Sequence, residues 1–235
     1  MLKITTWNIC FSSKLQEPRY LEILSQTKSL NWDICCFQEC IPKFIGLMSA
    51  DNYWFDNYDF SDIDFVSSGY GTMMIAKKYL EFKFKSYDLT SKMNRKLVVG
   101  TNLDLTVGSV HLESLNSREV RAIQLEEISV LLKSFGSPNT ILCGDFNFCS
   151  KLNYSNNEDV LENLNLTKFL PEYKDLESKP TWSNGKRSFR FDRILMKSEY
   201  LKVCTNNLLG TNPLPGYAQT YPSDHKGIFV SLEII

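Results

Sequence analysis

The fold is decided by residues 139–147, NTILCGDFN. The run TILC is nearly all apolar, and a short apolar run bounded by turn residues is typical of a strand buried on both faces. The polar stretch GDFN follows directly, so the strand ends in a loop that carries Asp145 and Asn147. A strand covered on both faces needs layers above and below its sheet. The stretch therefore predicts an α/β protein with polar side chains at a strand end.

The segments on the N-terminal side alternate between strands and helices. Residues 2–9, LKITTWNI, and residues 33–39, DICCFQE, have strand-like composition, and residues 17–30 between them carry apolar side chains at helical spacing. A second helix is predicted from Asn116, because Glu119 follows three residues later as in a capping box. The apolar stripe predicted for this helix comprises Val120, Ile123, Ile128, Leu131 and Phe135.

The remaining predicted elements complete a layered α/β sandwich. They are strands at residues 71–78, 96–105, 106–114, 189–197 and 227–234, and a short helix at residues 157–166. The strands at 96–105 and 106–114 are expected to pair as a hairpin around Leu105 and Thr106. No linker or low-complexity stretch divides the sequence, so residues 1–235 are interpreted as one catalytic domain.

Composition argues against several classes of protein. The net charge of −1 gives no global basic field for nucleic acid, although Lys186, Arg187, Arg190 and Arg193 cluster locally. No apolar run approaches the roughly 18 residues of a membrane span, so no membrane partner is expected. The N-terminus lacks a signal-peptide pattern, and the seven scattered cysteines fit buried thiols better than disulfides. We expect an intracellular, reducing location, in the nucleus or cytoplasm, and a monomer.

Six predicted strand ends carry an acid, an amide or an imidazole beside residues that should be buried. They are Asn8, Glu39, His111 with Ser114, Asp145 with Asn147, Asp192, and Asp224 with His225. Taken singly, most have a plain explanation: an Asn or Asp forms a turn, a strand histidine is structural, and Asp192 forms a salt bridge. Glu39 is harder to dismiss, because a buried carboxylate needs a partner or a metal. Repetition at six strand ends favours a site, since sites in α/β proteins gather where strand ends converge.

The residue types in this set suit metal-assisted attack of water on a phosphodiester. Carboxylates such as Glu39 are ligands for Mg²⁺, which keeps several waters and offsets charge on the phosphate. An Asp near an Asn can hold a water and accept its proton, and a histidine oriented by an acid can stabilise the charged intermediate. The sequence has no Gly-rich phosphate loop, GxSxG elbow or HExxH motif, which removes several competing classes.

In this order, the stretches TWN, QE, a strand-ending H, GDFN, FDRI and SDH resemble the endonuclease/exonuclease/phosphatase superfamily of Mg²⁺-dependent phosphodiesterases. Finer detail resembles its 5′-tyrosyl-DNA phosphodiesterase branch, which removes trapped topoisomerase II from DNA ends. The stretches concerned are TWNI, FQECIP, GYGTMMIAKK, KMNRKLVV, HLES, PTW, RFDRI and PSDHKG. The resemblance implies two packed mixed β-sheets flanked by helices, and Mg²⁺ as cofactor, for which Mn²⁺ can substitute. It implies as partner DNA with a 5′-tyrosyl-linked peptide or protein, including single-stranded 5′ ends.

The resemblance also implies a chemical role for each polar residue. Glu39 would bind the metal, with Asn8 and Asp224 completing the metal and water network. Asp145 would accept the proton of the attacking water, which Asn147 would position. The residues implied to contact phosphate or nucleotide are His225 (oriented by Asp192), His111 and Ser114. An apolar wall of Trp182, Phe191 and Tyr70 would hold the displaced 5′ end by stacking, although Trp182 fits a core position equally well.

Three positions depart from the family pattern. Cys10 stands where the family usually has an acid, which weakens a second metal ligand there. Asn116 stands where an arginine is usual, so Arg118 or Arg121 is expected to substitute, and Cys149 replaces a basic residue. These losses bear on DNA affinity more than on chemistry.

Other functions stay open. An abasic-site endonuclease or exonuclease of the same superfamily is one, although SDHKG lacks the proline usual after that histidine. A phosphatase of inositol lipids or sphingolipids fits less well. A non-catalytic nucleic-acid-binding relative predicts the loss of Glu39, Asp145 or His225, and all three are present.

Overall fold

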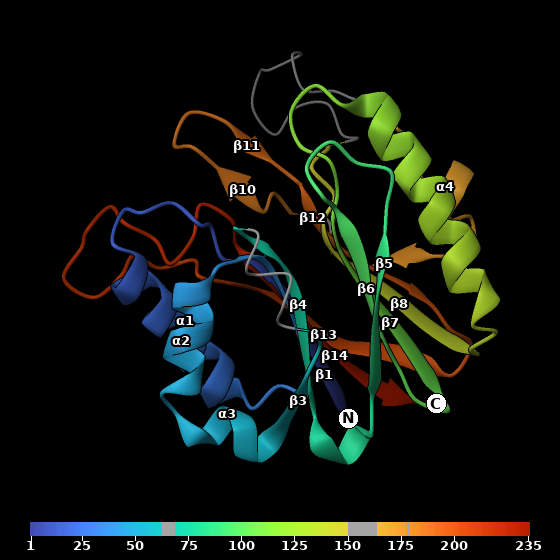
Figure 1. Cartoon of the computed structure of the whole chain (residues 1–235), viewed down its shortest axis with the longest axis horizontal. Coiled ribbons are helices and arrows are strands. Elements are labelled where there is room, and N and C mark those ends of the chain that lie inside the picture. The colour runs from blue at the N-terminus through green and yellow to red at the C-terminus, as the bar shows by residue number, and fades with distance from the viewer. Residues whose placement is uncertain (63–68, 150–163, 178) are drawn as a thin grey trace.

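Two six-stranded mixed β-sheets pack face to face in the computed structural model, which describes residues 1–62, 69–149, 164–177 and 179–235 (Figure 1). The first sheet has the strand order β13 (Leu201–Leu209), β14 (Gly227–Ile234), β1 (Leu2–Asn8), β2 (Ile34–Cys40), β4 (Gly71–Lys77) and β3 (Tyr58–Phe60). The second has the order β5 (Lys83–Asp88), β6 (Lys96–Thr101), β7 (Leu105–His111), β8 (Asn139–Asp145), β12 (Asp192–Lys197) and β9 (Lys174–Asp175).

Helices cover the outer faces of both sheets, which confirms the predicted α/β sandwich (Figure 1). Those on the first sheet are α1 (Gln16–Leu30), α2 (Pro42–Ser49) and α3 (Asn52–Asn57). Those on the second are α4 (Arg118–Ser134) and α5 (Leu166–Phe169). A 3₁₀ turn (Lys78–Leu80) and a small hairpin of β10 (Trp182–Ser183) and β11 (Ser188–Phe189) complete the elements. No helix within the described ranges is long and apolar enough to cross a membrane.

The apolar run of β2 is explained by its two buried faces. Ile34 and Cys36 point into the core between the sheets, whereas Cys35 and Phe37 pack under α1 and α2. Successive strand residues point to opposite faces, so a strand covered on both sides needs apolar residues at every position. β8 repeats the pattern in the second sheet.

Helix α4 begins at Arg118, two residues later than the sequence pattern predicts. It also turns a different set of side chains towards the core. Its N-cap is Ser117, without a side-chain cap, so the predicted capping box from Asn116 is wrong. The buried face carries Arg121, Gln124 and Leu125, and Ile123 of the predicted stripe is 43% exposed. Arg121 and Gln124 can occupy the buried face because they bond loop groups: Arg121 donates to the Glu113 carbonyl, and Gln124 bonds the Glu113 amide and the Thr90 carbonyl.

Other boundaries shift slightly. The predicted hairpin forms, but its turn lies at residues 102–104, where the Asn102 carboxamide oxygen accepts from the amides of Asp104 and Leu105. The strand predicted at 189–197 divides into the end of β11 and β12. The predicted helix at 157–166 lies outside the described residues up to position 163, and α5 begins at Leu166.

The central pair of strands in each sheet is parallel, and this places the polar strand ends together. β1 pairs with β2 up to Asn8, and β7 pairs with β8 up to His111 and Asp145. Because parallel strands end at the same edge, each sheet delivers two polar ends to one place.

Candidate active site

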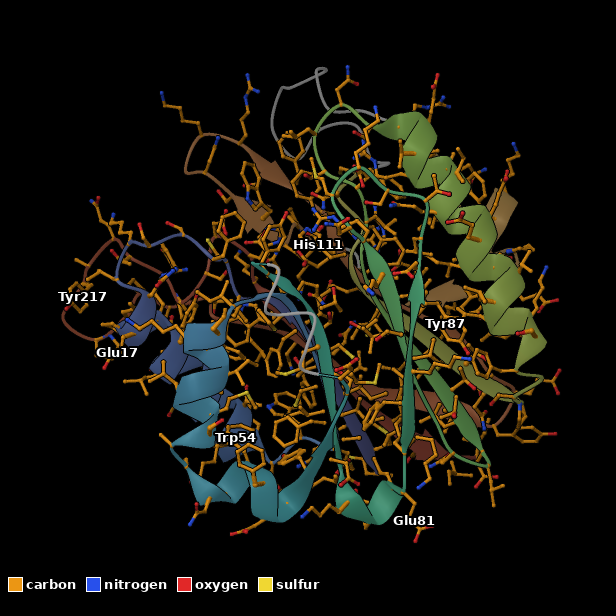
Figure 2. All side chains as sticks on the ribbon, viewed as in Figure 1. Glu17, Trp54, Glu81, Tyr87, His111 and Tyr217 are labelled. Carbon is orange, nitrogen blue, oxygen red and sulfur yellow. The ribbon has the colours of Figure 1, made fainter. Side chains whose placement is uncertain are left out.

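Asp145 lies at the centre of the site because β8 is flanked by β7 and β12. Its register partners are His111 on one side and Asp192 on the other. The carboxylate is 1% exposed; its Oδ2 accepts from Asn8 Nδ2 at 2.9 Å, and its Oδ1 accepts from the Asn147 amide at 2.8 Å. Figure 2 shows His111 where the central strands of both sheets end, between the α1–α3 layer and α4.

Burial makes Asp145 a better base than an ordinary aspartate. Desolvation raises the pKa of Asp145 to about 6, against the lowering effects of His225 and of the hydrogen bonds from Asn8 and Asn147. A carboxyl group with this pKa is still ionised at neutral pH, but it accepts a proton more readily than an exposed one.

His225 is held as a cation by two carboxylates. Its Nδ1 lies 2.8 Å from Asp192 Oδ2, and its Nε2 lies 3.8 Å from Asp145 Oδ2. Burial alone would lower the pKa of His225, but Asp192 and Asp145 outweigh it and raise the pKa to about 10. His225 is therefore an imidazolium at neutral pH, with Nδ1–H donated to Asp192.

His111 is held neutral, in one tautomer, by an arginine. Arg95 Nη1 lies 3.0 Å from His111 Nδ1, and since a guanidinium only donates, Nδ1 must accept and the proton must lie on Nε2. Burial and the positive charges of Arg95 and His225 hold the pKa of His111 well below its usual value. The Nε2 atom lies 3.5 Å from Asp145 Oδ2. Each histidine thus directs an N–H towards Asp145, one charged and one neutral.

Glu39 projects from a distorted point of β2. The pairing with β4 shifts register between Phe37 and Cys40, and Glu39 has a φ of 59°, a left-handed conformation that is strained for a side chain of this size. Its Oε1 accepts from Asn8 Nδ2 at 3.1 Å, and its Oε2 accepts from the Phe11 amide at 2.9 Å. Both carboxylate oxygens are therefore fixed in orientation.

The donor set fits a hard divalent cation at Glu39 and Asp224. Burial alone would raise the pKa of Asp224, but the His225 charge and the hydrogen bond from Trp182 Nε1 (2.9 Å) hold it below the usual value, so the group is ionised. Two carboxylates that line one cleft match the few protein ligands that Mg²⁺ uses. Cys10 adds no ligand of this kind, because burial and Asp224 raise the pKa of its thiol to about 11.

A second group of side chains consists of residue types that bind metals, but its histidine is protonated, whereas a histidine that binds a metal is neutral. Ligand atoms of Asp145, Asp192 and His225 lie within 4.8 Å of one another. His225 is protonated there and its Nδ1 bonds Asp192, so it offers no lone pair to a metal. We therefore interpret these three residues as a hydrogen-bonded acid–base unit.

A cleft of about 740 Å³ opens over these groups. All of the predicted site residues line it except Asn8 and Asp192, which lie beneath and support Glu39, Asp145 and His225. Arg118 lines the cleft, as expected of a substitute for the missing arginine. Arg121 does not: it is buried and donates to the carbonyls of Glu113 and Leu115, so that expectation is corrected.

The predicted aromatic wall is divided into two clusters. The rings of Trp182 and Phe191 lie 5.5 Å apart and pack with Phe189 beside His225. Tyr70 belongs to the other cluster, where it stacks on Phe11 at 4.7 Å, beside His111. Trp182 is half-buried and lines the cleft, so it is not the core residue of the alternative interpretation.

Four cleft residues were not identified from sequence: Phe11, Met93, Arg95 and Leu115. Arg95 had a signal, because it lies in the stretch KMNRKLVV and in a local cluster of cations. Its contact with His111 follows from the pairing of β6 with β7: Leu97 lies opposite Val110, so Arg95, directly before β6, comes close to His111. The predicted hairpin brings the two segments together, but the sequence does not show that the guanidinium turns towards the ring.

Comparison with known proteins agrees with this architecture. A model of the Endonuclease/Exonuclease/phosphatase family matches residues 5–225. The structure of D. rerio TDP2 complexed with single strand DNA product has a TM-score of 0.75 at 22% identity, covering 99% of this chain and 98% of the other. Truncated Caenorhabditis elegans TDP2 gives 0.73 at 20% identity, with coverages of 98% and 96%. The human Nocturnin catalytic domain with bound sulfate anion gives 0.68 at 20%, with coverages of 100% and 93%. A search of curated protein sequences found no match.

Proposed function

Because this chain belongs to the Endonuclease/Exonuclease/phosphatase family, we propose that it is a Mg²⁺-dependent phosphodiesterase that hydrolyses 5′-phosphotyrosyl bonds on DNA ends. Its family and its sandwich of two sheets are those of phosphodiesterases and nucleases. The observation that carries the reaction is the arrangement around Asp145: a buried base of raised pKa with two histidine N–H groups directed at one of its oxygens.

Six residues of the cleft have a task in this reaction. Asp145 takes the proton of the attacking water, and Asn147, anchored by its Nδ2 on the Leu112 carbonyl at 2.9 Å, positions that water. The N–H groups of His111 and His225 donate to the non-bridging phosphate oxygens, whose charge grows as the water attacks. When bound at Glu39 and Asp224, Mg²⁺ supplies the positive charge that stabilises the departing oxygen.

The substrate assignment rests on the cleft walls and on the branch-specific stretches of sequence. Trp182 and Phe191 offer aromatic faces on which a nucleotide at a single-stranded 5′ end can stack. A TDP2 of the same fold has been seen with a single strand DNA product. We further propose that trapped topoisomerase II is the physiological adduct and that the protein acts as a monomer. We also propose that its seven cysteines, none of which forms a disulfide, reflect a reducing intracellular location.

The test offers the protein two substrates, a 5′-phosphotyrosyl oligonucleotide and an abasic duplex, each with Mg²⁺, Mn²⁺ or EDTA. We expect release of tyrosine and a 5′-phosphate from the first only, with either metal and not with EDTA. Preferential nicking of the abasic duplex would support an abasic-site endonuclease instead. Binding without hydrolysis of either would support a non-catalytic relative.

A further inference from the structure

A second cleft of about 660 Å³ adjoins the active-site cleft, and Asp224 lines both. Its walls come from the loop after β1, the β10–β11 hairpin and the loop before β14. Hydroxyl and amide side chains dominate the lining, among them Ser12, Ser183, Thr211 and Gln219. We call this second cleft the polar groove.

Arg19 makes the polar groove a pre-formed site. Its side chain is buried, and its guanidinium donates to carbonyl oxygens of both flanking loops. The acceptors are the carbonyls of Ile9 (3.4 Å), Cys10 (3.0 Å), Ser12 (2.6 Å), Lys14 (2.9 Å) and Pro222 (3.5 Å). On the hairpin side, the amide of Ser183 donates to the Asp224 carbonyl and the amide of Lys226 to the Thr181 carbonyl. A groove fixed in this way binds a ligand without first having to order its walls.

The charges of the polar groove suit an anion. Lys14 and Lys226 both line it, and neither forms an ion pair with any residue in the described part of the chain. Asp224, at the junction with the active-site cleft, is the one carboxylate among the described residues that line it. The adjacent hairpin turn adds exposed cations at Lys186 and Arg187.

We propose that the DNA strand whose 5′ end is hydrolysed continues from the active-site cleft past Asp224 into the polar groove, where Lys14 and Lys226 bind its phosphates. This inference rests on the proposed function. Lysine, hydroxyl and amide groups are the usual partners of nucleic-acid phosphates, and they read no sequence. The groove thus extends the site from one nucleotide to several, and partly replaces the basic residues missing at Asn116 and Cys149.

The test is equilibrium binding, by fluorescence anisotropy, of 5′-phosphorylated single strands of two and eight nucleotides to the Asp145→Asn protein. The double variant Lys14→Ser/Lys226→Ser is compared with Lys83→Ser/Lys133→Ser, which removes two exposed lysines elsewhere. For the eight-nucleotide strand we expect about tenfold weaker binding at 0.1 M salt and a salt slope smaller by about 1.4, because each single-strand phosphate contact contributes about 0.7. The two-nucleotide strand and the control variant should show no change.

Equal loss for both strand lengths, or an unchanged salt slope, would overturn the inference. A loss of affinity seen only for strands that carry a tyrosyl peptide would place the peptide, not the DNA, in the polar groove. A different experiment, hydrolysis by the wild-type protein, shows whether the proposed function itself is wrong. In that case the wild-type protein would leave the phosphotyrosyl bond intact, whatever the binding results.

Discussion

Asp145 and Asp192 are register partners on the antiparallel strands β8 and β12, so two buried carboxylates lie side by side and share His225. Like charges this close are stable only with a cation between them, and the histidine supplies it. The same contact orients the imidazolium, raises the pKa of His225 and leaves Asp145 as the base.

The contact of His225 with Asp145 and Asp192 predicts a bell-shaped dependence of activity on pH, and Asp192→Asn should shift this curve. Activity requires Asp145 ionised and His225 protonated, so it should fall as pH drops through about 6 and as pH rises through about 10. Asp192 raises both pKa values, so removing its charge should move both limbs to lower pH, by about one unit. The measurement is kcat/KM against pH at saturating Mg²⁺. Asp88→Asn, at a position exposed to solvent, should leave both limbs in place, and unchanged limbs in Asp192→Asn would contradict the assignment.

Glu39→Gln should weaken metal binding more than chemistry. The amide keeps the shape of the side chain but loses the charge that a cation needs, so more Mg²⁺ should be required for half-maximal activity. Calorimetric titration with Mg²⁺ gives an independent readout, in which the affinity should fall by at least about 10- to 100-fold, the cost of losing a residue that only supports a ligand. Asp145→Asn provides the contrast, since its activity should not return at any Mg²⁺ concentration. Equal metal affinity in Glu39→Gln and wild type would place the ligand elsewhere.

Arg95→Met should release the tautomer of His111. With Nδ1 no longer accepting from a guanidinium, the proton can occupy either ring nitrogen, and the pKa of His111 should rise because a nearby positive charge is gone. ¹⁵N chemical shifts of the imidazole report both changes directly. The rate should fall by no more than the roughly 100-fold cost of losing one oxyanion donor. Lys96→Met, at the next position, keeps Arg95 and should leave the spectrum unchanged; a His111 spectrum identical to wild type in Arg95→Met would refute the role.

Gly144→Ala should be strongly destabilising, because this glycine lets β8 approach β7 at the entrance to the site. It has a φ of 134°, and an added Cβ would lie 2.0 Å from the Val110 carbonyl oxygen. We expect a loss of at least about 3 kcal/mol in the free energy of unfolding, measured by urea denaturation. Gly46→Ala is the matched control, since nothing lies within 4 Å of its Cβ position in α2, and it should be neutral or stabilising by up to about 1 kcal/mol. Similar stabilities for the two variants would contradict this account.

The sequence alone predicts the strands and the polar strand ends well, because their signals are local. β2 and β8 each contain a run of buried apolar residues, at 34–37 and 141–143, which follows from burial on both faces, and a polar residue soon after such a run stands out. Their convergence follows from the rule that parallel strands end at the same edge. Helix α4 shows where this reasoning fails: its buried face includes Arg121 and Gln124. Their partners are backbone groups of loops, at Glu113 just before the helix and at Thr90, and no periodicity shows where these loops lie.

Contacts between distant segments could not be predicted for the same reason. Phe11 and Tyr70 stack although 59 positions separate them, so Tyr70 lines the cleft as part of a different aromatic cluster from Trp182 and Phe191. The charge states of the two histidines are also invisible in sequence. They depend on Arg95 beside one ring and Asp192 beside the other.

The central claim is that the polar strand ends activate a water molecule to attack the phosphorus atom. The most direct test is to hydrolyse a 5′-phosphotyrosyl oligonucleotide in H₂¹⁸O with Mg²⁺ and to analyse both products by mass spectrometry. One ¹⁸O atom should appear in the 5′-phosphate and none in the tyrosine, and Asp145→Asn should lower the rate by about 10²- to 10⁴-fold. Label in the tyrosine, or a rate unaffected by the loss of Asp145, would contradict the account.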